Sequence, residues 1–123
     1  MLVTAPRLTA QNNVVLLNGT PTPAPLGVRA GTRYRLRFIN VHAARPSMIL
    51  RILRDSTVLT WRSVAKDGMP LPDDQVEVRR SQVQMGNGET YDFEFTAAEP
   101  ADLLFDIKAA NGQLLLKLPI RVR

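Results

Sequence analysis

The side chains able to do chemistry in this 123-residue chain are few and widely spaced. His42 is its only histidine, and it contains no cysteine. Redox metal sites in proteins are built from clustered imidazoles and thiolates, and nucleophilic catalysis by sulfur needs a thiol. We therefore expect no metal-binding, cofactor-binding or catalytic residue in this chain. His42 is interpreted as a surface-loop imidazole, the alternative being a metal shared with another chain or domain.

Four carboxylates gather near one loop: Asp67, Asp73, Asp74 and Glu77. Such a group can mark a hard-cation site or an acid–base pair. However, Asp73 and Asp74 lack EF-hand spacing, and neighbouring residues of an extended segment face opposite ways. We interpret these acids as turn caps or as partners of nearby arginines. The serines likewise lack the nucleophile-elbow setting that a hydrolase would need.

Trp61 and Met69 are the apolar residues closest to this acidic loop. Trp61 either lines a cleft or, as we favour, fills the core between two sheets. Together with His42 and Asp67, these residues are the candidate cleft or docking contacts.

The chain is basic, with 16 Lys and Arg against 11 Asp and Glu, a formal net charge of +5. The arginines run from Arg7 to Arg123 without forming one block, which predicts a solvated, arginine-rich strand surface. Nucleic-acid modules of this size usually add exposed aromatics or a recognisable motif, and neither is present, so no nucleic-acid partner is expected. No apolar run approaches the roughly 20 residues of a membrane span, and residues 1–6 do not resemble a signal peptide.

The elements that must position these residues are strands. Residues 33–40 alternate strictly: Arg33, Arg35 and Arg37 share one face, and Tyr34, Leu36 and Phe38 the other. This period of two predicts a strand with one wet and one buried face. Further strands are expected at 14–17, 26–29, 47–54, 58–64, 75–85 (with a bend at residues 79–80), 90–95, 102–108 and 114–122.

The intervening segments carry turn signals. Residues 66–74 are expected to form a loop, with at most one helical turn near Pro72, and residues 86–88 a tight hairpin. Asn111-Gly112 predicts a type I′ hairpin, followed by a strand with Leu114, Leu116, Leu118, Ile120 and Val122 inward and Pro119 on an unpaired side. Residues 1–13 read as an irregular arm and 14–123 as one domain. Seven to nine short strands predict an all-β Greek-key sandwich.

Four segments, in order, resemble one protein family. LLNG at residues 16–19, VRAGTRYRLRFIN at 28–40, KDGMPL at 66–71 and GETYDF at 88–93 are similar to motifs of the middle domain of three-domain multicopper oxidases. Each motif is weak alone, but their common order over residues 14–95 is specific. The resemblance implies a cupredoxin-like, plastocyanin-like sandwich.

That family binds copper through His-x-His pairs and a His-Cys-His run in its first and third domains, and none of these motifs occurs here. The resemblance therefore implies a copper-free spacer or docking domain of an exported oxidase, with neighbouring cupredoxin domains as partners and copper in the parent enzyme only. The chain alone is not expected to be catalytic, and it is expected to self-associate when isolated. The alternative is a free-standing basic module that binds an acidic protein or polysaccharide.

Overall fold

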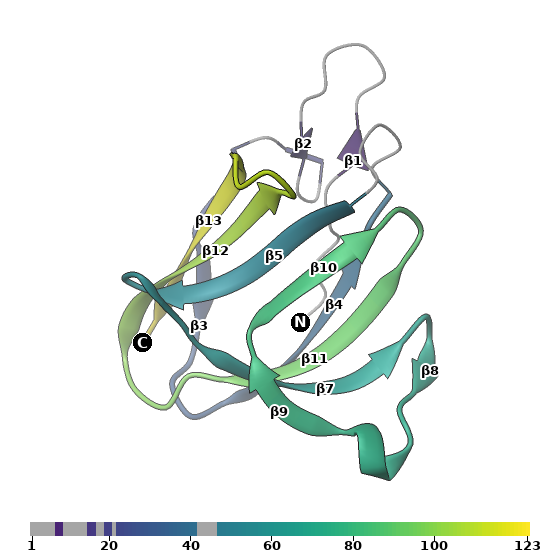
Figure 1. The fold of residues 1–123 in the computed structure, drawn as a ribbon. Coiled ribbons are helices and arrows are strands. Elements are labelled where there is room, and N and C mark those ends of the chain that lie inside the picture. Colours follow the sequence, from purple (N-terminus) through teal and green to yellow (C-terminus); the bar gives the residue numbers. More distant parts are fainter. Residues whose placement is uncertain (1–6, 9–14, 17–18, 21, 42–46) are drawn as a thin grey trace.

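Two antiparallel-rich sheets stack face to face in the computed structural model (Figure 1), which describes residues 7–8, 15–16, 19–20, 22–41 and 47–123. Sheet I has the order β10-β5-β12-β13-β3, with β6 paired to β5. Its strands are β3 (Leu26–Val28), β5 (Ser47–Arg54), β6 (Thr57–Val58), β10 (Gln82–Gly86), β12 (Ala101–Ala109) and β13 (Leu114–Val122). Sheet II has the order β4-β11-β7-β8, with β9 paired to β7. Its strands are β4 (Arg33–Ile39), β7 (Thr60–Lys66), β8 (Met69–Pro70), β9 (Glu77–Arg80) and β11 (Thr90–Thr96).

A small third sheet pairs β1 (Arg7–Leu8) with β2 (Val15–Leu16), so a two-residue strand lies inside the segment expected to be an irregular arm. Within the described residues, β1, β2, β6 and β8 are only two residues long, and the other nine strands are longer. The chain changes from one large sheet to the other immediately before each of the strands β4, β5, β7, β10, β11 and β12. This order confirms the predicted Greek-key sandwich.

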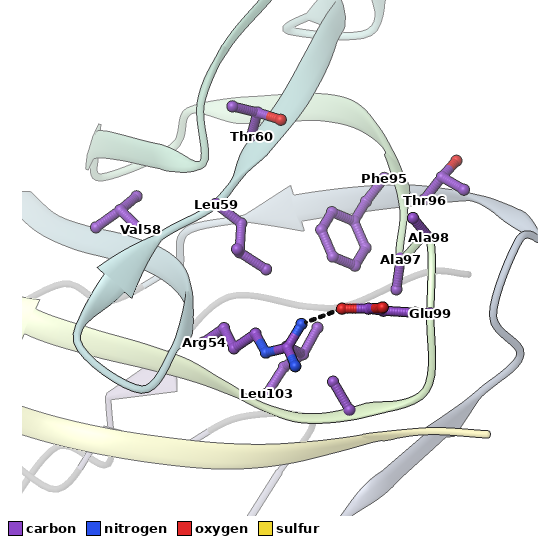
Figure 2. Close-up of a pocket in the computed structure, with 11 residues that line it drawn as sticks. Arg54, Val58, Leu59, Thr60, Phe95, Thr96, Ala97, Ala98, Glu99 and Leu103 are labelled. Atoms are coloured by element: carbon purple, nitrogen blue, oxygen red, sulfur yellow. Dashed lines mark hydrogen bonds and ion pairs between the residues drawn. The ribbon is translucent and has the colours of Figure 1, made fainter.

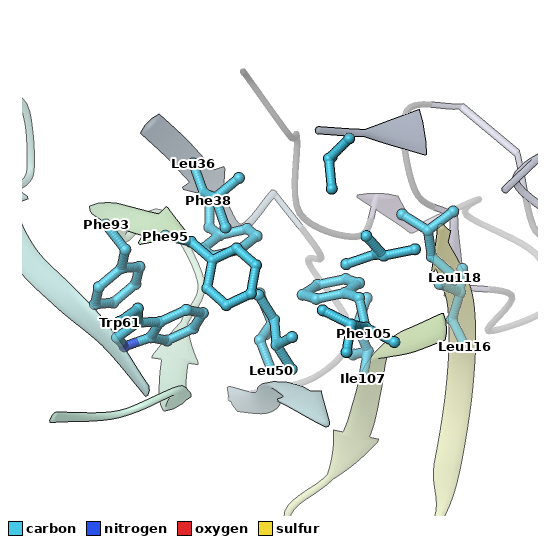
Figure 3. Close-up of a cluster of buried hydrophobic side chains, with 14 of the residues drawn as sticks. Leu36, Phe38, Leu50, Trp61, Phe93, Phe95, Phe105, Ile107, Leu116 and Leu118 are labelled. Carbon is cyan, nitrogen blue, oxygen red and sulfur yellow. The ribbon is translucent and has the colours of Figure 1, made fainter. Parts of the chain in front are cut away.

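The alternation in β4 determines which face of sheet II is buried. Leu36 and Phe38 are buried, whereas Arg33, Arg35 and Arg37 are exposed on the opposite face, as the sequence predicts. Buried side chains of both sheets interdigitate in one core (Figure 3), where the ring of Phe38 stacks on that of Phe105 across the two sheets at 5.5 Å. Burying a large apolar side chain stabilises a fold by about 1.5–3 kcal/mol. Burial of the apolar face of sheet II against sheet I therefore favours the two-layered architecture.

The predicted bend near residues 79–80 is confirmed, and it is the point where the chain leaves one sheet for the other. β9 pairs with β7 in sheet II, whereas β10 pairs with β5 in sheet I. Ser81 is fully buried between them; its N–H donates to the Leu59 carbonyl and its hydroxyl to the Ile52 carbonyl, each at 2.8 Å. The strand expected at 58–64 is also broken at Leu59, where the chain makes the opposite crossing from β6 to β7.

The turn at residues 86–88 is not the expected hairpin, because it joins β10 of sheet I to β11 of sheet II. Asn40 stabilises this turn through two hydrogen bonds. The backbone carbonyl of Asn40 accepts from the Gly88 N–H at 2.8 Å, and its side-chain Nδ2 donates to the Met85 carbonyl at 3.1 Å. Gly88 has a φ of +84°, a left-handed conformation that glycine adopts without steric cost. The turn is therefore a connection between layers.

The final hairpin, β12–β13, forms as predicted but with different turn geometry. Gly112 has a φ of +90°, whereas Asn111 does not have the positive φ that a type I′ turn requires at both central residues. The register shifts between Ile107 and Lys108, which lets Leu115 enter as an extra residue and turns Leu114 outward; Leu114 is 48% exposed. The other four alternate residues of β13 are buried as expected.

The segment expected to be a loop at residues 66–74 is partly regular. Met69 and Pro70 form β8, which pairs with the end of β7 in the register Lys66↔Met69 and Ala65↔Pro70. The predicted helical turn is confirmed as a 3₁₀ turn, η1 (Asp73–Gln75). Proline is tolerated in β8 because a strand at a sheet edge has one side without ladder hydrogen bonds. Pro119, likewise, precedes the part of β13 that pairs with β3.

Candidate docking and binding site

The donor atoms of this chain do not fit a redox copper. A type 1 centre takes two imidazoles and a thiolate, and the sequence offers one histidine and no cysteine. His42 lies outside the described residues. Within the part of the chain that the structure describes, no three His, Cys, Asp or Glu side chains cluster in a way that could hold a metal ion. No catalytic step can be derived through copper held by these residues alone.

The turn between β7 and β8 places two of the four predicted contact residues together. Asp67 has a φ of 51°; its N–H donates to the Thr90 carbonyl at 2.7 Å, and its Oδ1 accepts from the Thr90 N–H at 3.0 Å. These two bonds hold the turn against β11. Met69 follows with 70% of its surface exposed. Asp67 therefore fixes a turn that leaves the apolar side chain of Met69 exposed.

Trp61 lies elsewhere, in the core, as the favoured interpretation of the sequence held. It is 2% exposed, and its ring stacks on Phe93 with centroids 3.9 Å apart and planes 13° apart. Its indole Nε1 has no hydrogen-bond partner among the described residues. Trp61 is the second residue of β7, at the opposite end of the strand from Asp67, so the structure does not bring the tryptophan to the β7–β8 turn.

A polar hollow of about 360 Å³ lies beside the acidic loop, lined in part by Lys66, Asp74, Glu77 and Tyr91. Lys66 donates to Glu89 at 2.9 Å, and its Nζ lies 5.1 Å from the centroid of the Tyr91 ring. The Lys66 hydrogen bond, followed by the Gly86 N–H, holds the pKa of Glu89 below its usual value. Glu77 is paired with Arg79. Of the four acids singled out in the sequence, Glu77 thus has an arginine partner, whereas the partner of Lys66 is Glu89, which lies outside that group.

A second hollow, of about 390 Å³, lies at one end of the sandwich between β5–β7 and the β11–β12 loop (Figure 2). Its apolar wall includes Leu59, Phe95 and Leu103, and an ion pair between Arg54 and Glu99, 2.6 Å apart, crosses it. The sequence reasoning missed this hollow, because no motif marks the loop at residues 97–100. Its apolar wall and open mouth suit an inserted side chain from a packing neighbour.

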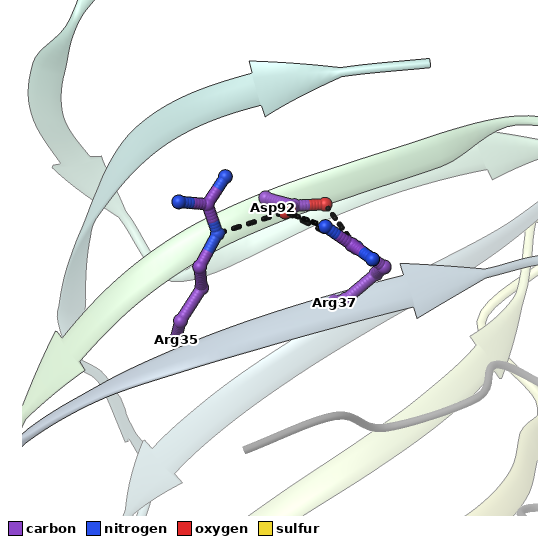
Figure 4. Close-up of polar contacts among 3 residues, drawn as sticks. All are labelled: Arg35, Arg37 and Asp92. Carbon is purple, nitrogen blue, oxygen red and sulfur yellow. Dashed lines mark hydrogen bonds and ion pairs between the residues drawn. The ribbon is translucent and has the colours of Figure 1, made fainter. Parts of the chain in front are cut away.

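The outer face of sheet II carries a buried carboxylate held by two arginines (Figure 4). Asp92 is 1% exposed; it accepts from the Arg35 Nε at 2.9 Å and from the Arg37 Nη2 at 3.0 Å. Burial alone would raise the pKa of Asp92. The hydrogen bonds and charges of Arg37 and Arg35 outweigh that effect, so the pKa lies below its ordinary value.

The chain resembles known proteins in its fold. No family model matches the chain, and no curated protein does. Solved structures match over its whole length. A multicopper oxidase is 18% identical, with a TM-score of 0.73 over 100% of this chain and 42% of its own. A laccase-like multicopper oxidase from Ochrobactrum sp. is 20% identical, with a TM-score of 0.67 over 99% and 30%.

The blue copper oxidase of Nitrosomonas europaea matches similarly, with 19% identity and a TM-score of 0.66 over 89% of this chain and 34% of its own. This chain therefore has the fold of a cupredoxin-like domain of such oxidases, which confirms the predicted fold class. It spans less than half the length of each of these three structures. No helix in the described part of the chain is long and apolar enough to cross a membrane.

Proposed function

We propose that this chain is the copper-free middle domain of an exported multicopper oxidase and that it acts by docking to neighbouring copper-binding domains. The observation that carries the proposal is a full cupredoxin-like sandwich encoded by a sequence with one histidine and no cysteine. The parent enzyme would oxidise small substrates and reduce dioxygen at its own copper sites. Here the domain contributes shape alone.

The surface of the domain offers contacts for this docking. Met69 at the β7–β8 turn and the hollow at the end of the sandwich combine apolar groups with an ion pair at the rim. Interfaces between domains of one chain commonly have this mixed composition. We assign Asp67 and Met69 to the docking surface, with His42 as a further candidate; Trp61, which is buried in the core, is left out of it.

The proposal is tested by comparing the isolated chain with the complete polypeptide encoded by its reading frame. The flanking sequence is expected to encode His-x-His and His-Cys-His motifs. After reconstitution with Cu(I) and Cu(II), the complete polypeptide should hold copper and show an intense blue band, whereas the isolated chain should hold essentially none. Stop codons close on both sides, or stoichiometric tightly held copper in the isolated chain by mass spectrometry, would contradict the proposal.

A second candidate function is a basic binding module that recognises an acidic partner. The observation that favours it is the arginine-rich outer face of sheet II, where Arg33, Arg35, Arg37 and Arg62 are each about half exposed or more. Salt weakens such binding by screening the charges, so an affinity for acidic ligands that does not change with ionic strength would count against this candidate.

A further inference from the structure

The outer face of sheet II carries more positive charge than its carboxylates neutralise. β11 lies between β4 and β7: its Glu94 is flanked by Arg35 and Arg62, whereas its Asp92 lies opposite Arg37 on β4. Each carboxylate is shared: Arg35 and Arg37 bind Asp92, while Arg33 and Arg62 lie 3.4 Å and 3.6 Å from Glu94. Four guanidinium groups thus meet two carboxylates, which leaves two positive charges in excess. We call these four arginines the guanidinium row.

The carboxylates lie at the floor of this face and the arginines above them. The Asp92 and Glu94 side chains are 1% and 22% exposed, whereas those of Arg33 and Arg35 are 69% and 53% exposed. Arg35 contacts Asp92 only through Nε, and Figure 4 shows its two terminal nitrogens pointing away from that carboxylate. A guanidinium group carries five N–H donors, so most donors of the row remain available to a partner in the described structure.

The spacing of the row indicates what kind of anion fits it. Arg33, Arg35 and Arg37 are alternate residues of one strand, so their attachment points repeat every ~6.7 Å. An extended peptide with Asp or Glu at alternate positions presents carboxylates at the same repeat. Planar guanidinium groups bind carboxylates through paired hydrogen bonds, which adds geometric selectivity to the attraction of charge.

An apolar feature beside the row favours a protein partner over another polyanion. A shallow hollow of about 210 Å³ is lined by Arg33, Arg62, Val78 and Glu94, among others. Val78 pairs in register with Arg62 and is 67% exposed, so an apolar surface lies directly beside the charges. A sulfated polysaccharide offers no side chain for this contact, whereas an acidic peptide can place one there.

We infer that the outer face of sheet II docks an extended acidic segment of another polypeptide, with carboxylates on alternate residues against the guanidinium row and an apolar side chain against Val78. The inference rests on the second candidate function and makes its partner specific, but it is independent of the proposed copper-free role, because it needs no parent oxidase. A chain that holds no copper could still fail to bind the acidic segment, and the reverse is also possible.

The test uses the whole 123-residue chain and two synthetic peptides of equal composition. One peptide alternates Glu with Ser, and the other carries the same glutamates in one block. Binding by calorimetry or fluorescence anisotropy should favour the alternating peptide and should weaken as salt is raised. Equal affinity for both peptides, or tighter binding to a sulfated polysaccharide or single-stranded RNA of matched charge, would overturn the inference.

Variants locate the binding face. The pair Arg33→Gln and Arg62→Gln should weaken binding of the alternating peptide by about tenfold or more, since two charge-assisted contacts are lost. The matched control, Lys117→Gln with Arg121→Gln, removes the same charge from exposed positions on sheet I and should change affinity by less than about twofold. An equal loss in the control would show attraction by net charge alone and overturn the inference.

A third variant keeps the charge constant. Val78→Ser should weaken binding of an alternating peptide that carries a leucine at its end, but not of the peptide without it. Because Val78 is exposed, this change leaves the core intact, and a far-UV spectrum and unfolding midpoint equal to those of the parent chain would verify the fold. No difference between the two peptides would overturn the assignment of the apolar contact.

Discussion

Asp92 shows how one charged residue can be both buried and stabilising. A carboxylate that is 1% exposed would destabilise the fold if it had no partners, because leaving water disfavours the charged form. The hydrogen bonds and charges of Arg35 and Arg37 favour the charged form of Asp92 by more than burial disfavours it. About half of the surface of each arginine side chain stays exposed to water. An ion pair with an exposed arginine has a smaller desolvation penalty than one with a buried arginine, since only the carboxylate is removed from water.

Asp92→Asn is expected to lower the free energy of unfolding by about 1–2 kcal/mol at neutral pH. The pKa of Asp92 in the fold lies below its ordinary value of 3.8, so its contribution is full above that value and is lost as the pH falls through the lowered pKa. The difference between parent and variant should therefore shrink below about pH 4. Urea unfolding followed by tryptophan fluorescence at several pH values measures this.

The matched control for that change is Glu99→Gln, which removes a carboxylate from the exposed pair with Arg54. Surface pairs of this kind contribute about 0–1 kcal/mol, so the control should have a smaller effect at every pH. A loss equal to that of the Asp92 variant would show that the buried clamp has no special importance for stability.

At the scale of elements, the turns decide which layer each strand joins. The turn between β3 and β4 contains Gly31, whose φ is +79° and whose N–H donates to the Ala97 carbonyl at 2.7 Å. One residue thus ties the start of β4 to the β11–β12 loop. A Cβ added at Gly31 would meet no other atom within 4 Å. Glycine is therefore favoured there by the positive φ of the backbone and not by a lack of space for a side chain.

Gly31→Ala is therefore expected to cost about 1–2 kcal/mol through backbone strain alone. Gly27→Ala, four residues earlier in β3, is the control: it also meets open space, but Gly27 does not have a positive φ. That substitution should be neutral or should stabilise the fold by up to about 1 kcal/mol, because alanine has less freedom in the unfolded chain. Thermal unfolding of both variants gives the comparison; equal midpoints would refute the role of Gly31.

How far the sequence predicts these elements depends on how local their causes are. The alternation of Arg33, Leu36 and Phe38 is a property of one strand, and it fixed the facing of β4 correctly. Leu114 points outward because of a bulge in the pairing with the partner strand β12, and no residue of β13 predicts that bulge. The crossing at Ser81 likewise depends on carbonyls of Ile52 and Leu59, which are distant in sequence.

The candidate site was predicted to a similar extent. The Asp67-Gly68 turn with its exposed Met69 could be anticipated from turn chemistry, and the arginines of β4 were visible as a row. Their partner Asp92 is identified only once β11 is known to lie beside β4. The hollow at the end of the sandwich depends on the packing of three separate loops and strands, so no single segment encodes it.

At the scale of the whole molecule, sheet II offers two kinds of exposed surface. The outer face of sheet II is arginine-rich, while its β8–β9 edge exposes Met69 and Val78 at 70% and 67%. Both strands pair with the same side of β7, so these two apolar side chains lie along one sheet edge. An edge of this kind has unpaired backbone groups and some apolar surface, which together favour contact with another chain.

The isolated chain is expected to form a dimer or larger species through this edge, and salt should promote the association. The net charge of +5 makes two copies repel each other, and added salt screens that repulsion without weakening apolar contact. Binding of an acidic segment has the opposite salt dependence, so the two associations can be separated. Met69→Ser should reduce self-association, whereas Leu114→Ser, an exposed position on sheet I, should not. Light scattering over a range of protein and salt concentrations tests this expectation, and a monomer at the highest values of both would refute it.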